Sequence, residues 1–380
     1  MPHHCALVGL SQVFLFAGLA LAQSAPITVT ETAGIRRAAF PTAARVHFDR
    51  GALAAAQNAR LTLGGKETPA QFTAESKWPD GSVEWLAIDW NTTIGPDEKQ
   101  AFTLEYGAGL ASALPRGLSV SEDAESIQAG ALRFSKTGNP LLLSVKYRDE
   151  EIGQGMNGLF VTDGKGQRHD LAKTVGLRAE ILKRGPLVVT IRYTGSVVVD
   201  DQYSAPFTLT VETVSSKTIV KIAATVEDPA RRLTDIGVGT PLVLGALPWT
   251  WDFGTSRWTY GSFRAATDSV SLTQDPAGTW AVKTGVQLYE RSPAGNSEPV
   301  TWGHFQNTKE VVAFALETSP GVTRRVSFDG SGQALYSLES TGPTHSISVI
   351  EHFVTTPVQI GAATSPASLL SPLRVETPTR

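Results

Sequence analysis

The residues best suited to chemistry lie between Pro248 and Gly261, in the sequence PWTWDFGTSRWTYG. Four of its aromatic residues form two pairs, each spaced two positions apart, with the turn sequence Gly254-Thr255-Ser256 between them. Alternate residues of a strand share a face, so a hairpin would align all four rings in a platform for pyranose sugars. The flanking carboxylate and guanidinium would bond sugar hydroxyls or a uronate carboxylate. The predicted binding residues are Trp249, Trp251, Trp258, Tyr260, Asp252 and Arg257. The alternative is that the rings close one end of a hydrophobic core.

Two histidines are the candidate catalytic residues. His304 lies between glycine and phenylalanine, and His345 follows the sequence Gly342-Pro343-Thr344. Histidines in such settings occur in sugar clefts, and they also occur as hydrogen-bonded structural residues. No metal site is predicted, because no HExxH motif is present and the adjacent pair Glu351-His352 would point to opposite faces of a strand. No cofactor is predicted.

These residues must be positioned by β-strands, and the predicted fold class is all-β. The apolar stretches are short, rich in Val, Ile, Thr and aromatic residues, and bounded by Gly, Pro, Asp or Asn. In Phe207–Val214, for example, Phe207, Leu209 and Val211 alternate with polar residues, as in a strand with one buried face.

The strand pattern divides into two parts. Apolar periodicity is lost across Gly107–Ser126, which gathers Gly, Ala, Ser, Pro and acidic residues. We predict a small β-barrel domain at residues 26–110 and a large antiparallel β-sandwich at residues 120–360. Residues 361–380 have the Pro/Ser-rich character of a tail or linker.

The N-terminus predicts export from the cytoplasm. An apolar stretch ending in Ala20-Leu21-Ala22 is typical of a secretory signal, so residues 1–22, including the single cysteine Cys5, are predicted to be removed. The expected location is secreted or periplasmic, and after cleavage no apolar run is long enough to span a membrane. Lys and Arg total 33 against 36 for Asp and Glu, which argues against a nucleic-acid partner.

Several motifs resemble those of a known family. The clearest is WPDGSVEWL at residues 78–86, accompanied by Phe40-Pro41 and the stretch Arg50-Gly51-Ala52-Leu53. They resemble the N-terminal RIFT barrel of the exo-rhamnogalacturonan lyase family, and Val226-Glu227-Asp228-Pro229 and Gly342-Pro343-Thr344-His345 resemble its central β-sandwich. The resemblance implies an association with pectin-type polysaccharide. Family members continue into a C-terminal helical toroid, which has no counterpart in these residues.

Three functions follow from these observations. The leading hypothesis is a secreted, non-catalytic protein that binds pectin-type polysaccharide, with a separate catalytic chain as a further partner. The second is a polysaccharide lyase, which needs a base, an acid and a group that neutralises the substrate carboxylate. The third is a structural or envelope scaffold that binds no sugar. A solvent-facing aromatic hairpin favours the first hypothesis, converging histidines the second, and burial of all the rings the third.

Overall fold

The chain is all-β, as predicted. The computed structural model describes residues 22–113, 115–136, 142–147, 150–153, 158–255, 257, 259–293, 299–308, 310–317, 321–354 and 370–378. Nearly all of the predicted signal sequence, with Cys5, lies outside the described residues. Within the described part of the chain, no helix has the length and apolar character needed to cross a membrane.

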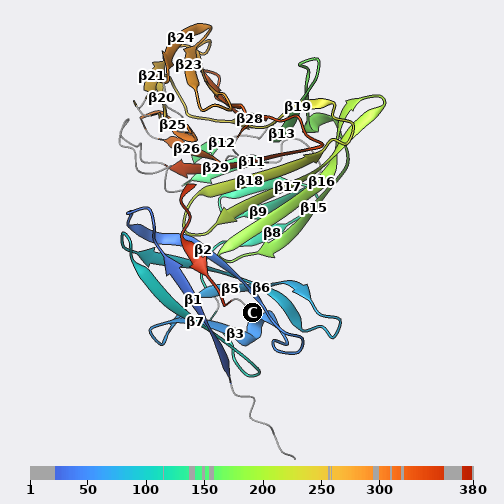
Figure 1. The fold of residues 1–380 in the computed structure, drawn as a ribbon, viewed down its shortest axis with the longest axis vertical. Coiled ribbons are helices and arrows are strands. Elements are labelled where there is room, and N and C mark those ends of the chain that lie inside the picture. The colour runs from blue at the N-terminus through green and yellow to red at the C-terminus, as the bar shows by residue number, and fades with distance from the viewer. Residues whose placement is uncertain are drawn as a thin grey trace, which may run out of the picture.

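The first domain is built from two small sheets, drawn in blue in Figure 1. Its strands are β1 (Gln23–Thr30), β2 (Arg37–His47), β3 (Ala59–Leu63), β4 (Lys66–Thr68), β5 (Ala70–Lys77), β6 (Val83–Ile94) and β7 (Lys99–Tyr106), with the short 3₁₀ helix η1 (Ala56–Asn58). The alternating side chains of these strands enclose a separate hydrophobic core, in which Trp90 packs edge-on against Phe102.

The WPDGSVEWL motif makes a tight turn between β5 and β6. The Trp78 amide donates a hydrogen bond to the carbonyl of Ser82 at 2.8 Å, and Gly81 has a φ of 86°, which favours glycine. The Asp80 carboxylate accepts bonds from the amide and hydroxyl of Ser82. The Trp78 indole donates to the carbonyl of Phe48 at 3.0 Å, so this ring ties the turn to the barrel.

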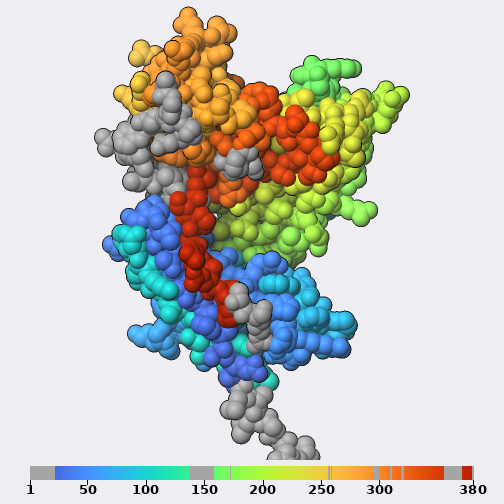
Figure 2. Space-filling view, viewed as in Figure 1, coloured from blue at the N-terminus to red at the C-terminus, as the bar shows by residue number. Residues whose placement is uncertain are grey.

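The C-terminal residues return to the first domain. Strand β30 (Arg374–Glu376) pairs antiparallel with β1, with Val375 opposite Val29, and Figure 2 shows the dark-red segment lying across the blue domain. Part of the predicted tail at residues 361–380 is therefore a strand of the first domain's larger sheet, whose order is β30-β1-β7-β3-β4. Backbone pairing and burial of Leu373 hold this segment in place despite its loop-like composition.

The second part of the chain contains three antiparallel sheets. The five-stranded sheet consists of β8 (Val120–Glu122), β9 (Ser126–Ala129), β10 (Leu132–Ser135), β11 (Leu142–Tyr147) and β12 (Glu150–Gly153). The eight-stranded sheet consists of β13 (Gly158–Asp163), β14 (Arg168–Asp170), β19 (Leu233–Pro241), β22 (Ser269–Gln274), β23 (Trp280–Thr284), β24 (Gln287–Arg291), β27 (Arg324–Asp329) and β28 (Gln333–Glu339). The nine-stranded sheet consists of β15 (Thr174–Arg184), β16 (Val188–Asp200), β17 (Tyr203–Val214), β18 (Ile219–Glu227), β20 (Trp249–Phe253), β21 (Thr259–Phe263), β25 (Trp302–Gln306), β26 (Val311–Glu317) and β29 (Thr344–Val354). A second 3₁₀ helix, η2 (Leu171–Lys173), precedes β15.

The eight- and nine-stranded sheets form a sandwich over one large core. Phe305 of the nine-stranded sheet stacks on Phe328 of the eight-stranded sheet, with ring centroids 4.8 Å apart. In β17 the predicted alternation is present, with Phe207, Leu209 and Val211 all buried in this core. The sandwich thus has a fixed inner face, and the polar residues between these positions lie on its outer face.

Specific polar contacts join the two domains. The side-chain oxygen of Gln71 accepts hydrogen bonds from the amides of Leu187 and Val188, and its nitrogen donates to the Val188 carbonyl. Lys183 forms an ion pair with Asp89 at 2.8 Å, and burial raises the pKa of that carboxyl despite the ammonium group. These contacts couple the barrel to the sandwich. The boundary at residues 110–120 between two separable domains therefore stays a prediction.

Candidate functional site

Strands β20 and β21 form a hairpin at one edge of the nine-stranded sheet. Its register places Trp251 opposite Gly261 and Asp252 opposite Tyr260. Figure 1 shows this hairpin beside β23 and β24, at the end of the sandwich away from the first domain. The segment singled out in the sequence therefore lies on an edge where both sheets end.

The predicted platform of four aligned rings is not formed. Trp249 and Trp251 are 6% and 1% exposed and belong to the sandwich core, where Trp249 packs edge-on against Phe305. The register pairs Tyr260 with Asp252 rather than with Trp251, so the Tyr260 side chain points to the face of the hairpin opposite the two tryptophans. On that face it is 56% exposed. Trp258, the fourth predicted ring, lies outside the described residues.

Three exposed side chains nevertheless lie on these edge strands and the turn before β21, those of Tyr260, Tyr289 and Arg257, which we call the tyrosine edge. The Tyr260 ring is on the side of Asp252, and the Tyr289 ring is on the side of Trp251. Tyr289 on β24 is 52% exposed and donates a hydrogen bond from its hydroxyl to the Tyr260 carbonyl at 2.9 Å. Its ring also packs edge-on against buried Trp251, with centroids 5.6 Å apart. This bond bridges the edge strand of one sheet to that of the other, and together with the Trp251 contact it fixes the ring of Tyr289.

The turn that carries Arg257 is fixed by buried hydroxyl groups. The Thr255 hydroxyl oxygen accepts hydrogen bonds from the amides of Arg257 and Thr259, and the two threonine hydroxyls are 2.8 Å apart. The Thr259 hydroxyl donates to the Glu290 carboxylate on β24 at 2.6 Å. The Arg257 side chain is 60% exposed and lies 4.0 Å from the same carboxylate, so it is oriented but free to bind an external anion.

Sequence reasoning missed Tyr289. It lies in the five-residue strand QLYER, where Leu288 and Tyr289 are both exposed because β24 is the last strand of its sheet. The usable signal was two adjacent large apolar residues in a short, otherwise polar strand, because neighbouring side chains of a strand point to opposite faces and both cannot enter the same core.

The structure brings Asp252 and His304 together as a buried pair. The Asp252 carboxylate accepts hydrogen bonds from the backbone amide of His304 at 2.7 Å and from its Nδ1 at 2.8 Å. An ionised carboxylate can only accept, so Nδ1 donates to it, and in the neutral form of the ring Nε2 has the lone pair. Nε2 is buried without a hydrogen-bond partner. This arrangement orients a base, but the His304 side chain is only 3% exposed and so does not face bulk solvent.

His345 belongs to a different network. Its Nε2 lies 3.3 Å from the Asp228 carboxylate, which also accepts bonds from the Tyr203 hydroxyl and the Leu233 amide. His345 is fully buried and holds the turn that follows β18.

The two candidate histidines do not converge. His304 on β25 pairs with Ala313 on β26, which in turn pairs with His352 on β29. His345 lies seven residues before His352 on β29, which is roughly 23 Å along the strand. An odd spacing also places His345 on the opposite face of the sheet. Among the described residues, no three His, Cys, Asp or Glu side chains are grouped so as to hold a metal ion.

Comparison with known proteins supports these assignments at the level of domains. Residues 33–106 match the PcRGLX-like N-terminal RIFT barrel domain. No curated protein matches the sequence. Among solved structures, an α-mannosidase from Enterococcus faecalis V583 is similar over 94% of this chain, with 11% identity and a TM-score of 0.60. This chain covers 46% of that protein's length.

Two other structures match over a smaller part of the chain. The GH36 α-galactosidase AgaA from Geobacillus stearothermophilus is similar over 63% of this chain and 41% of its own, with 8% identity and a TM-score of 0.35. A galactose mutarotase-like protein from Clostridium acetobutylicum is similar over 64% of this chain and 99% of its own, with 8% identity and a TM-score of 0.36. The family match over residues 33–106 shows that the first domain resembles the PcRGLX-like N-terminal RIFT barrel, as predicted. That family match supports a carbohydrate-related role.

Proposed function

We propose that this protein is a non-catalytic carbohydrate-binding protein that holds pectin-type polysaccharide on the tyrosine edge. The observation that carries the proposal is the exposed ring of Tyr289, which a hydrogen bond to the Tyr260 carbonyl holds in place next to a second exposed tyrosine, Tyr260. Exposed rings that are already ordered lose little conformational entropy when a sugar stacks on them. The location proposed for this activity is secreted or periplasmic, on the basis of the predicted signal sequence at residues 1–22.

The acidic character of the proposed ligand follows from Arg257. This guanidinium is 60% exposed and lies 4.0 Å from the carboxylate of Glu290, the residue that follows Tyr289. A guanidinium binds a carboxylate through two parallel hydrogen bonds, which suits the uronate groups of pectin better than a neutral sugar. We therefore expect polygalacturonate and rhamnogalacturonan to bind more tightly than a neutral galactan, and Arg257→Gln to reduce this preference.

Removal of either exposed ring should weaken polysaccharide binding without unfolding the protein. We expect Tyr260→Ala and Tyr289→Ala each to lower the affinity for rhamnogalacturonan oligosaccharides by up to about tenfold, since stacking contributes roughly 0.5–1.5 kcal/mol per ring. Isothermal titration calorimetry measures the affinity, and thermal unfolding checks the fold. Val175→Ala is the matched control, because Val175 is also an exposed apolar residue but lies on β15. Unchanged affinity in both tyrosine variants would refute the proposal.

A second candidate function, a polysaccharide lyase, rests on the Asp252–His304 pair. Its Nε2 has the lone pair that a base requires to remove a proton next to a uronate carboxylate. Incubation of the purified protein with rhamnogalacturonan or polygalacturonate, followed by absorbance of the unsaturated product, separates the two candidates. A rise in absorbance that is lost in His304→Gln would support the lyase and replace the binding proposal.

A further inference from the structure

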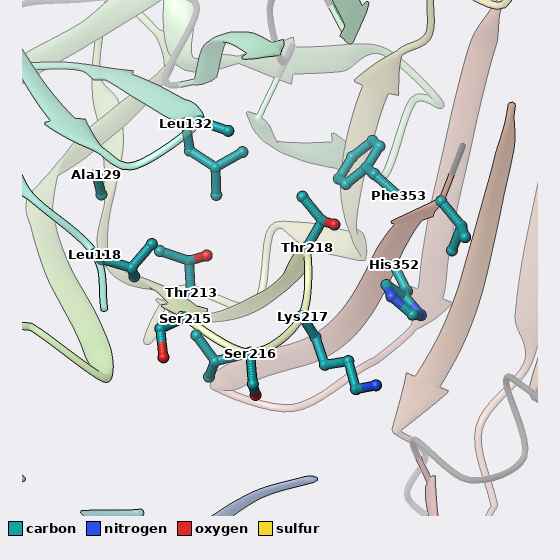
Figure 3. A pocket seen from close by; sticks show the side chains of 13 residues that line it. Leu118, Ala129, Leu132, Thr213, Ser215, Ser216, Lys217, Thr218, His352 and Phe353 are labelled. Carbon is teal, nitrogen blue, oxygen red and sulfur yellow. The ribbon is translucent and has the colours of Figure 1, made fainter. Parts of the chain in front are cut away.

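The polar side chains that the structure describes around one cavity do not converge on its apolar wall (Figure 3). The cavity has a volume of about 450 Å³ and lies where the turn between β17 and β18 meets the end of β29. Leu118 and Leu132 form the apolar wall, whereas the Ser216 hydroxyl and the Lys217 ammonium are directed away from it. A small-molecule site needs polar groups that converge on an apolar pocket, and this cavity does not provide them.

Strand β15 is a long edge strand of the nine-stranded sheet. It has 11 residues and pairs with β16, while β21, with five residues, forms the opposite edge of the sheet. Figure 1 shows β15 and the hairpin of β20 and β21 on opposite sides of the sandwich. Among the described strands, none pairs with the outer side of β15, so its outward-pointing backbone groups can bond to a further strand.

The side chains of β15 are apolar on one face and charged on the other. Leu177, Ala179 and Ile181 pack against the sandwich core but stay partly exposed, because no described strand lies beyond them. Arg178 and Glu180 alternate with these residues and are exposed on the outer face of the sheet. A further strand beside β15 would therefore extend the core over its three apolar residues.

Two register shifts delimit the regular part of the strand. The pairing with β16 shifts between Val175 and Arg178, and again between Ile181 and Lys183. Such bulges bend a strand and limit regular pairing beyond them. Pairing with a further strand is thus confined to residues 177–181.

The charges of this segment are self-complementary. When two identical strands pair antiparallel about Ala179, Arg178 of each copy lies opposite Glu180 of the other. On the opposite face, Leu177 of each copy meets Ile181 of the other. A register centred one residue to either side places two arginines or two glutamates directly opposite, where like charges repel. The sequence of β15 therefore favours one register with a second copy of itself.

The neighbouring charges are compatible with this pairing. Arg192 on β16 donates a hydrogen bond to the Glu180 carboxylate at 2.6 Å, and Arg178 of a second copy would approach that carboxylate from the other side. Arg178 forms no ion pair within the described part of the chain. The two cations beyond the second register shift are already paired with acidic residues of their own chain. A carboxylate can accept from two guanidinium groups, so the second copy adds an ion pair without breaking one.

We propose that β15 is a dimerisation edge, at which two copies of this chain join their nine-stranded sheets into one continuous sheet across a two-fold axis at Ala179. The tyrosine edge takes no part, because Tyr260 lies on β21 at the other end of the sheet. The dimer presents two tyrosine edges, roughly 80 Å apart along the sheet at about 4.8 Å per strand. If these edges bind sugar as proposed above, one dimer holds a polysaccharide at two points and binds it more tightly than a monomer.

Sedimentation velocity of the full chain between about 1 and 100 µM measures the dimer. We expect the wild type to dimerise as its concentration rises. Arg178→Glu places glutamates opposite each other at both contacts, so it should raise the dimer dissociation constant at least about tenfold. The charge swap Arg178→Glu/Glu180→Arg restores complementarity and should return that constant to within about fivefold of the wild type. Lys165→Glu is the matched control, because it makes the same charge change on the exposed turn between β13 and β14.

Three outcomes would overturn the proposal: a wild type that stays monomeric at about 100 µM, a dimer that Arg178→Glu does not weaken, or a charge swap that does not restore dimerisation. Thermal unfolding shows whether each variant is folded. If Arg178→Glu does not fold, hydrogen exchange of the wild type decides. The outward amides of residues 177–181 should then exchange more slowly at the higher protein concentration, and exchange independent of concentration would refute the dimer. None of these measurements uses a sugar, so their outcome is independent of the proposed function.

Discussion

Trp251→Ala should lower the free energy of unfolding by about 3–5 kcal/mol, as expected when a fully buried aromatic ring is deleted. Trp251 is 1% exposed and contacts Phe253 in the core and Tyr289 at the surface. The variant leaves a cavity beneath the hairpin, and the ring of Tyr289 loses its support. Chemical denaturation monitored by circular dichroism measures the change.

Tyr260→Ala is the matched control for this prediction, because it removes a ring from the same hairpin but from the solvent side. We expect it to change the free energy of unfolding by less than about 1 kcal/mol. Equal stability losses in the two variants would show that Tyr260 is also part of the core. That result would contradict the tyrosine edge as a binding surface.

Glu351→Gln should raise the stability of the protein at pH 8 by about 3 kcal/mol and leave it unchanged near pH 4. Glu351 is fully buried between the two sheets, where it accepts hydrogen bonds from Thr240 and Tyr336, and burial raises its pKa from 4.5 to about 7. In the unfolded chain the carboxyl ionises above pH 4.5, whereas the folded protein retains the proton up to about pH 7. The stability contributed by the proton is therefore complete below pH 4.5 and is lost as the pH rises through 7.

The measurement is the difference in unfolding free energy between Glu351→Gln and wild type across this pH range. The amide keeps the shape of the side chain and carries no charge, so other titrating groups cancel in the difference. Glu180→Gln, on a 61% exposed side chain of β15, is the control and should show little pH dependence. A Glu351→Gln difference that does not grow between pH 5 and pH 8 would mean that the buried carboxyl has an ordinary pKa.

The all-β class and the first domain could be predicted because they depend on local patterns. Alternation along Phe207–Val214 reports which face of a strand is buried, and the Pro79-Asp80-Gly81 sequence has strong turn preferences. The sequence match over residues 33–106 is consistent with this. Such signals are contained within about ten residues and do not depend on distant parts of the chain.

The candidate site was harder to predict because it depends on register and on distant partners. A shift of one residue in hairpin pairing separates Tyr260 from the faces of Trp249 and Trp251, and local spacing does not fix that register. The pairing of Asp252 with His304 joins residues 52 positions apart. Both residues were candidates, but nothing in the sequence placed them in contact.

The pairing of β30 with β1 also has a consequence for biosynthesis. During translation the first domain emerges with β1 paired to β7 on one side, while its other edge must wait for residues 374–376. An unpaired edge strand can recruit other chains, so the nascent barrel is exposed to misassembly until residues 374–376 have been synthesised. Closure of the N-terminal domain is thereby coupled to completion of the sandwich, and a truncated product would show its defect first in the barrel.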